Sequence, residues 1–183
     1  MLLIECMSTR AGLLLSIVAL FTFTAAHAAD ATLLIRGEVK TPLKLSLAEI
    51  KSLQSTIVSA KDHSGNTARY EGIPLAELLR RAGVPQGEAL RGDALQLYVI
   101  VKAADGYKAL FALAELDPAM TEKQVLFAFR RDGAELDAAA GPLRIVVPDE
   151  KRQARWVRQV TEFEVIRAGV GQKSDQTQQS KNL

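Results

Sequence analysis

Short segments rich in apolar and β-branched residues recur between Ala31 and Ala168, and turn residues separate them. A series of short strands with few helices is typical of α+β domains built on mixed or antiparallel sheets. A dinucleotide-binding fold is excluded, because no G-x-G-x-x-G motif follows a strand and strands do not alternate regularly with helices. We therefore expect one α+β domain over residues 29–168.

The expected strands differ in how far they are buried. The segment Gln124–Arg130 is apolar on both faces, which predicts a buried central strand that ends at the turn Asp132-Gly133. The strands that we expect are Thr32–Val39, Thr56–Ala60, Leu95–Val101, Tyr107–Phe111, Gln124–Arg130, Leu143–Val147 and Val160–Ile166.

Two short helices are expected between these strands. Ser46 and Glu49 have the spacing of a capping box, so a helix should begin at Leu47. A second helix should run from Pro74 to Ala82, because proline suits the first helical position and Gly83 follows as a stop signal.

The two ends of the chain differ from the domain. Residues 1–28 are typical of a signal peptide, with Arg10 before an apolar stretch and with Ala26-His27-Ala28 as a cleavage site. A membrane-spanning helix is the alternative, but the apolar stretch has about 14 residues and a span needs about 20. We expect a periplasmic or secreted protein that keeps no stable membrane anchor after cleavage. Residues 169–183 are polar and predict a disordered tail.

Composition excludes several classes of function. The 23 lysines and arginines nearly balance the 21 acidic residues, so the strong positive charge that nucleic-acid binding needs is missing. The chain has one cysteine, Cys6, and two histidines, which cannot form a cysteine-rich or histidine-rich metal site. Cleavage of the signal peptide would remove Cys6 and leave a mature chain with no thiol. We therefore predict no metal site and no nucleic-acid partner.

Four segments in this order resemble the oxidoreductase molybdopterin-binding domain of the sulfite oxidase type. They are Gly37-Glu38-Val39, then Tyr70–Leu75, then Ala104-Asp105-Gly106-Tyr107, and finally Gly141–Pro148 followed by Arg155-Trp156. The resemblance implies a mixed α+β fold and a molybdenum ion that is held by a pterin cofactor and by one protein cysteine. It places that cysteine near Val58–Asp62, with Ala60 as the best match, but no cysteine is present there.

The resemblance thus makes molybdopterin a candidate cofactor without its protein thiolate. Ser59 or Asp62 could supply an oxygen ligand instead, because high-valent ions accept hard oxygen donors. Neighbouring strand residues point to opposite faces, however, which argues against this alternative.

Charged residues near the expected strands suggest an anion-binding cleft. His63 is either a surface-turn histidine or, with Ser64, a hydrogen-bond donor at the cleft. Arg144 interrupts an apolar strand, so it must meet a carboxylate, solvent or a ligand anion. A structural salt bridge is the simpler of these interpretations.

A basic cluster follows Pro148 and surrounds Trp156. If it formed a helical turn, Lys151, Arg152 and Arg155 would share one face, suited to a phosphate or a carboxylate. A solvated basic surface is the alternative. The predicted ligand-binding residues are Ala60, Asp62, His63, Ser64, Gly72, Arg144, Lys151, Arg152 and Arg155. No catalytic residue is assigned.

Three functions remain open at this point. The first is a non-catalytic or weakly catalytic domain that binds an anionic small molecule. The second is an active molybdenum–pterin oxidoreductase with a ligand other than cysteine. The third is a module that binds a protein partner in an exported redox or sensory system.

Overall fold

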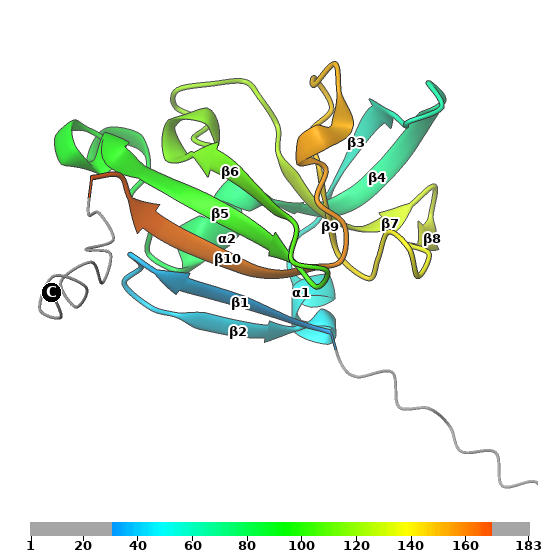
Figure 1. The fold of residues 1–183 in the computed structure, drawn as a ribbon, viewed down its shortest axis with the longest axis horizontal. Helices are drawn as coiled ribbons and strands as arrows, with labels where there is room; N and C mark the ends of the chain where they lie inside the picture. Colours follow the sequence, from blue (N-terminus) through cyan, green and yellow to red (C-terminus); the bar gives the residue numbers. More distant parts are fainter. Residues whose placement is uncertain (1–30, 170–183) are drawn as a thin grey trace, which may run out of the picture.

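The computed structural model describes residues 31–169, which form two β-sheets and a few short helices (Figure 1). The first sheet has the strand order β2-β1-β10-β5-β6. Strands β1 and β10 run parallel, and the other neighbours in this sheet are antiparallel. Its strands are β1 (Thr32–Gly37), β2 (Leu43–Ser46), β5 (Leu97–Ala103), β6 (Lys108–Ala112) and β10 (Val160–Arg167).

The second sheet has the order β3-β4-β7-β8, and β9 pairs with β7. All of these pairings are antiparallel. Strand β7 is thus central, as its apolar sequence predicts, and residues Leu126 to Phe129 are buried. The strands are β3 (Thr56–Lys61), β4 (Thr67–Pro74), β7 (Leu126–Arg131), β8 (Ala134–Glu135) and β9 (Arg144–Val146).

The helices are short and lie between the strands. Helix α1 (Leu47–Ser52) begins at the predicted capping box, in which Ser46 and Glu49 each accept a backbone hydrogen bond from the other. Helix α2 (Leu75–Arg81) begins after Pro74 and buries Leu75, Leu78 and Leu79. Four 3₁₀ turns complete the list, η1 (Gly87–Ala89), η2 (Gly92–Gln96), η3 (Leu113–Glu115) and η4 (Gln153–Arg155).

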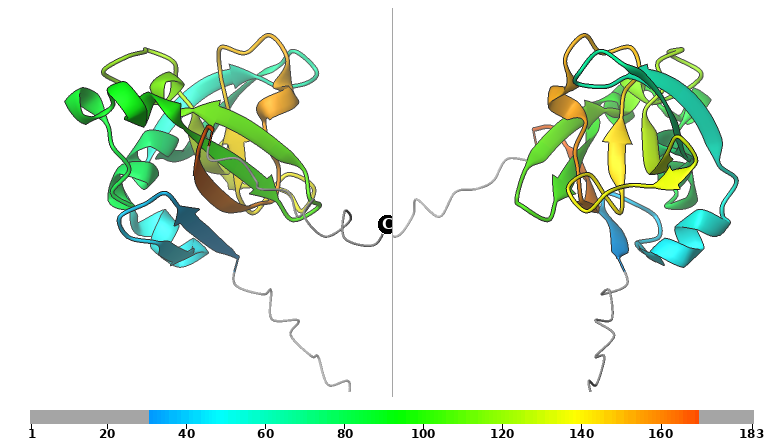
Figure 2. Two further views of the ribbon diagram at one scale, coloured as in Figure 1. Left: turned by 60° about the vertical axis from the view of Figure 1, so that its left-hand side comes forward. Right: turned by 90° about the vertical axis from the view of Figure 1, so that its right-hand side faces the viewer.

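The two sheets bury their apolar side chains against each other in one core. Strand β5 shows the pattern, because its residues alternate between buried and partly exposed along the strand. Phe127 on β7 meets Phe163 on β10, with ring centres 5.1 Å apart and an edge-to-face arrangement. Views from two further directions show the strands of both sheets around this core (Figure 2).

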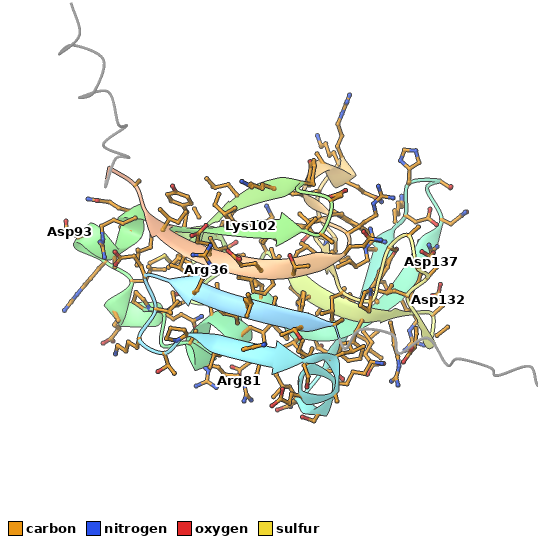
Figure 3. All side chains as sticks on the ribbon, turned by 60° about the horizontal axis from the view of Figure 1, so that its bottom comes forward. Arg36, Arg81, Asp93, Lys102, Asp132 and Asp137 are labelled. Atoms are coloured by element: carbon orange, nitrogen blue, oxygen red, sulfur yellow. The ribbon has the colours of Figure 1, made fainter. Side chains whose placement is uncertain are left out.

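The opposite face of the first sheet carries a network of ion pairs. Lys102 on β5 lies between two glutamates of β10, with Nζ 2.8 Å from Glu162 and 2.6 Å from Glu164. Arg36 on β1 bonds to the same two glutamates. Arg36 and Lys102 project from this face in Figure 3. Their charges are thus compensated locally.

The α+β class with mixed sheets is confirmed, and each expected strand overlaps an observed one. The sequence does not predict strands β2, β4 and β8. Strand β4 forms a hairpin with β3, and it matters most because it borders the candidate site.

The ends of the chain lie outside the part that the structure describes. The predicted signal peptide falls there entirely, as do residues 29–30 of the predicted domain and residues 170–183 of the predicted tail. Among the described residues, no helix is long and apolar enough to cross a membrane.

Candidate functional site

A cleft of about 780 Å³ lies between the tip of the β3–β4 hairpin and the segment that joins β9 to β10. These two parts of the chain are side by side in the upper part of Figure 1, the hairpin in cyan-green and the segment in orange. Positively charged side chains predominate in the cleft wall. They are Arg131, Arg144, Lys151, Arg152 and Arg158, and His63 lies among them.

Arg144 is the most deeply buried of these charges, because strand β9 carries it into the core. Only 8% of the residue is exposed, and its Nε has no hydrogen-bond partner among the residues that the structure describes. Burial lowers the pKa of its guanidinium, and the charges of Arg131 and Arg158 act in the same direction, whereas the nearby Tyr70 and Asp137 act against them. The expected salt bridge is absent, since no carboxylate within residues 31–169 forms an ion pair with Arg144.

Aromatic rings surround the Arg144 guanidinium in place of a carboxylate. Its Cζ lies 5.7 Å from the centre of the Tyr70 ring and 5.4 Å from that of Trp156. The two rings meet edge to face, with centres 5.7 Å apart. Trp156 Nε1 donates to the Val147 carbonyl, whereas the buried Tyr70 hydroxyl has no hydrogen-bond partner within residues 31–169. Two of the residues that line the cleft therefore carry a buried donor with no hydrogen-bond partner among residues 31–169.

Asp62 organises the hairpin at the cleft edge. Its carboxylate accepts hydrogen bonds from the backbone N–H groups of Ser64 and Asn66, each at 2.9 Å, and from Arg131 at 2.6 Å. Burial acts to raise the pKa of Asp62, but the hydrogen bonds from Arg131, Asn66 and Ser64 outweigh it and lower the pKa. Asp62 thus stays ionised and presents His63 and Ser64 at the edge of the cleft.

Asp137 is the second carboxylate in the cleft wall, and it also accepts hydrogen bonds from backbone N–H groups. It accepts hydrogen bonds from the N–H groups of Ala139 and Ala140, at 2.9 and 2.8 Å. Two carboxylates therefore face five lysine or arginine side chains, and the cleft carries a net positive charge.

The structure brings most of the predicted ligand-binding residues together. Those that line the cleft are Asp62, His63, Ser64, Arg144, Lys151 and Arg152. Sequence reasoning does not propose Tyr70, Arg131 or Arg158 as ligand-binding residues. The sequence does contain a signal that could have placed Tyr70 on a strand, because Ala68, Tyr70 and Gly72 alternate with polar residues.

Two predicted residues lie outside the cleft for reasons of packing. Ala60 is a buried residue of β3 that pairs with Ala68, and it borders a neighbouring hollow together with Ser59. Gly72 sits at a bulge where β4 approaches β7, and an added Cβ atom would lie 2.6 Å from the Cα of Ala128. The position of Gly72 thus reflects close backbone packing.

Arg155 also lies elsewhere, and the expected shared face with Lys151 and Arg152 does not form. Segment 153–155 is a single 3₁₀ turn that directs Arg155 toward β6 and η3. Its guanidinium bonds to Glu115, with Nη1 to Oε1 at 2.9 Å, and to Glu150. Its Cζ lies 4.4 Å from the centre of the Phe111 ring. Lys151 and Arg152 remain exposed beside the cleft.

The residues at this site fit an anion but not a molybdenum ion bound by a protein thiolate. Residues 31–169 contain no cysteine, and a methyl group stands at Ala60, the best match to the ligand position. No group of three or more histidine, cysteine, aspartate or glutamate side chains within these residues could hold a metal ion. The unpartnered Nε of Arg144 and the hydroxyl of Tyr70 suit an oxygen acceptor.

Comparison with known proteins agrees with this fold. A family model described as the oxidoreductase molybdopterin-binding domain matches residues 21–172. The crystal structure of the sulfane dehydrogenase SoxCD from Paracoccus pantotrophus is similar, with a TM-score of 0.58 and 21% sequence identity over 73% of this chain. The chain spans 37% of that protein's length. No curated protein sequence matches it. Because the family model covers most of the chain, the protein belongs to the oxidoreductase molybdopterin-binding domain family, of the sulfite oxidase type.

Proposed function

We propose that this domain binds an anionic small molecule in the basic cleft and does so without a molybdenum ion held by a protein thiolate. The observation that carries the proposal is the guanidinium of Arg144, which is 8% exposed and has no carboxylate partner within the described residues. Burial of an unpaired charge is costly, and a bound anion would offset that cost.

The neighbours of Arg144 favour an oxygen-bearing anion. Tyr70 lines the same cleft, and its buried hydroxyl is also without a hydrogen-bond partner among residues 31–169, so two different groups could donate to a ligand that reaches them. Oxygen atoms of carboxylates, phosphates and sulfur oxyanions accept such bonds. The exposed Lys151 and Arg152 at the cleft edge add a field that attracts anions from solution.

The absence of a thiolate carries the second half of the proposal. The resemblance to this family implies a cysteine sulfur that fixes the metal, and residues 31–169 contain no cysteine. We therefore assign no redox step to the cleft. The arginine and lysine side chains bind and orient the ligand, and the Tyr70–Trp156 pair excludes water from the guanidinium.

A titration of the full chain tests anion binding. Trp156 is the single tryptophan and contacts Arg144, so its fluorescence should report a ligand. We expect a saturable change with at least one of inorganic phosphate, sulfite and citrate. Arg144→Gln should abolish the response, and Arg91→Gln, which removes a charge from an exposed site outside the cleft, should preserve it. A flat titration with all three anions would contradict the proposal.

We also propose that the protein is exported, on the basis of the signal-peptide pattern in residues 1–28. Expression of the full chain and mass spectrometry of the periplasmic fraction test this. The expected product begins at Ala29. A cytoplasmic protein that retains residues 1–28 would contradict export and leave the binding proposal unaffected.

A further inference from the structure

The segment between β9 and β10 forms one wall of the cleft, yet its first half has little regular structure. From Pro148 to Arg155 it contains only the 3₁₀ turn η4. This half carries the exposed Lys151 and Arg152. Side-chain contacts must therefore set its position.

Two side chains attach this half to strand β6 and its turn. The hydroxyl of Tyr107, the residue just before β6, donates to the Ala154 carbonyl at 2.6 Å. Arg155 Nη1 donates to the Leu110 carbonyl at 3.1 Å, and its guanidinium lies over the Phe111 ring. The side chains of Tyr107 and Arg155 both lie outside the cleft, behind its wall.

Carboxylates strengthen the attachment through Arg155. Glu115 in η3 accepts from Nη1 at 2.9 Å and from Nη2 at 3.2 Å, which ties the segment to η3. Glu150, a residue of the segment itself, accepts from Nε at 2.7 Å and holds the segment together internally. Lys123 bonds to Glu115 at 3.2 Å and joins the same network. Every nitrogen of the Arg155 guanidinium thus has a partner, which leaves Arg155 no free donor for a ligand.

The other side of the segment is attached to the hairpin. Gln153 Nε2 donates to the Lys61 carbonyl at 2.7 Å, next to Asp62. The segment, which carries Lys151 and Arg152, is therefore held between β6 and the hairpin.

We propose that Tyr107 and Arg155 are positioning residues for the anion site. They hold segment 149–155 against β6, so that Lys151 and Arg152 face the ligand bound at Arg144. The proposal rests on the proposed function, because it concerns the affinity of the same cleft. A ligand anion contacts neither residue directly.

Tyr107→Phe tests the proposal, because it removes only the hydroxyl that bonds to Ala154. The matched control is Tyr98→Phe, which removes the same group from β5 outside the cleft. We expect Tyr107→Phe to raise the dissociation constant for inorganic phosphate about 3- to 10-fold, the range expected for one lost hydrogen bond. Amide hydrogen exchange in residues 149–155 should accelerate, and exchange in β1 and β10 should not change.

A second variant tests the other attachment, which Arg155 makes. Arg155→Lys keeps the charge but loses the multiple hydrogen bonds of the guanidinium, and it should weaken phosphate binding in the same range. Faster exchange in residues 149–155 with an unchanged dissociation constant would overturn the proposal, because the contacts would then be merely structural. If the unmodified chain binds no phosphate, sulfite or citrate, the proposed function fails first, and the positioning role fails with it.

Discussion

The guanidinium carbon of Arg144 lies 5.4 Å from the centre of the Trp156 ring, and no carboxylate among residues 31–169 forms an ion pair with this buried arginine. A cation–π contact of this kind contributes about 0.5–2 kcal/mol, less than the cost of burying an unpaired charge. The contact with Trp156 therefore offsets only part of the cost of burying the Arg144 charge. An anion in the cleft would supply the missing partner.

Replacement of Arg144 by an apolar side chain of similar length should stabilise the fold. Arg144→Met removes the unpaired charge and keeps most of the packing, so we expect the free energy of unfolding to rise by about 1–2 kcal/mol. Urea denaturation measures this change. Phosphate should stabilise the unmodified protein but not the variant. The control Arg91→Met should change stability by less than about 0.5 kcal/mol, and a marked loss of stability in Arg144→Met would argue against an unpaired charge.

Removal of a carboxylate from the cleft should strengthen anion binding. Asp62→Asn keeps an oxygen acceptor for the hairpin N–H groups but releases the charge of Arg131. We expect the dissociation constant for phosphate to fall about 2- to 5-fold. Asp93→Asn removes the same charge outside the cleft and should have no effect. Weaker binding in Asp62→Asn would mean that hairpin geometry outweighs charge.

Gly72 should tolerate no larger residue, although it lies outside the cleft. An added Cβ would meet the backbone of Phe127 and Ala128, so Gly72→Ala should destabilise the domain by about 3 kcal/mol or more, the upper end of the cost of overpacking. Gly65→Ala is the control, because its Cβ would meet open space and the cost is only that of its positive φ, about 1–2 kcal/mol. Thermal unfolding compares the two variants. Equal losses would show that the bulge can relax.

Acid should loosen the segment that borders the cleft. Burial acts to raise the pKa of Glu115, but the bond from Arg155 and its other hydrogen bonds outweigh it and lower the pKa below the ordinary value of 4.5. The folded state therefore gains stability from ionised Glu115 above that value and loses it as pH falls through the lowered pKa. Urea denaturation between pH 7 and pH 3 should show this loss, and the free energy of unfolding should fall less steeply with pH in Glu115→Gln than in the unmodified protein. An identical pH dependence in the two proteins would contradict the role of ionised Glu115.

Molybdenum content provides an independent check on the ligand set. Protein purified from its native compartment should hold far less than one molybdenum per chain, because the described residues supply no thiolate. Elemental analysis measures the ratio, and fluorescence of the oxidised pterin detects the organic cofactor separately. A stoichiometric metal that survives dialysis would support the oxidoreductase alternative. The same measurement on Arg144→Gln would then show whether this cleft holds it.

Local pattern predicts the strands that are apolar, and it fails where glycine, proline or charged residues interrupt the pattern. Strand β7 is evident because both of its faces are apolar. Strand β4 is not, because Gly72 and Pro74 suggest a turn and a helix start, although its alternation is that of a strand. The partner strand β3 is predicted, but the hairpin that frames the cleft is not.

The sequence predicts the composition of the site but not the direction of its side chains. Arg144 stands out because a charge interrupts an apolar strand, yet its aromatic surroundings depend on Tyr70, which lies far earlier in the sequence and on another strand. The sequence-based prediction assigns Arg155 to the ligand, because spacing alone cannot show that its guanidinium pairs with Glu115 and lies over the Phe111 ring. Such long-range contacts arise only when the two sheets have formed.

The most direct test observes the Arg144 side chain itself during an anion titration. In ¹⁵N-labelled full chain, the Nε–H signal of Arg144 can be assigned by its loss in Arg144→Lys. Our account predicts a saturable shift of that signal with inorganic phosphate or sulfite, at the same concentrations that change the Trp156 fluorescence. A signal that stays in place while other arginine signals move would contradict it.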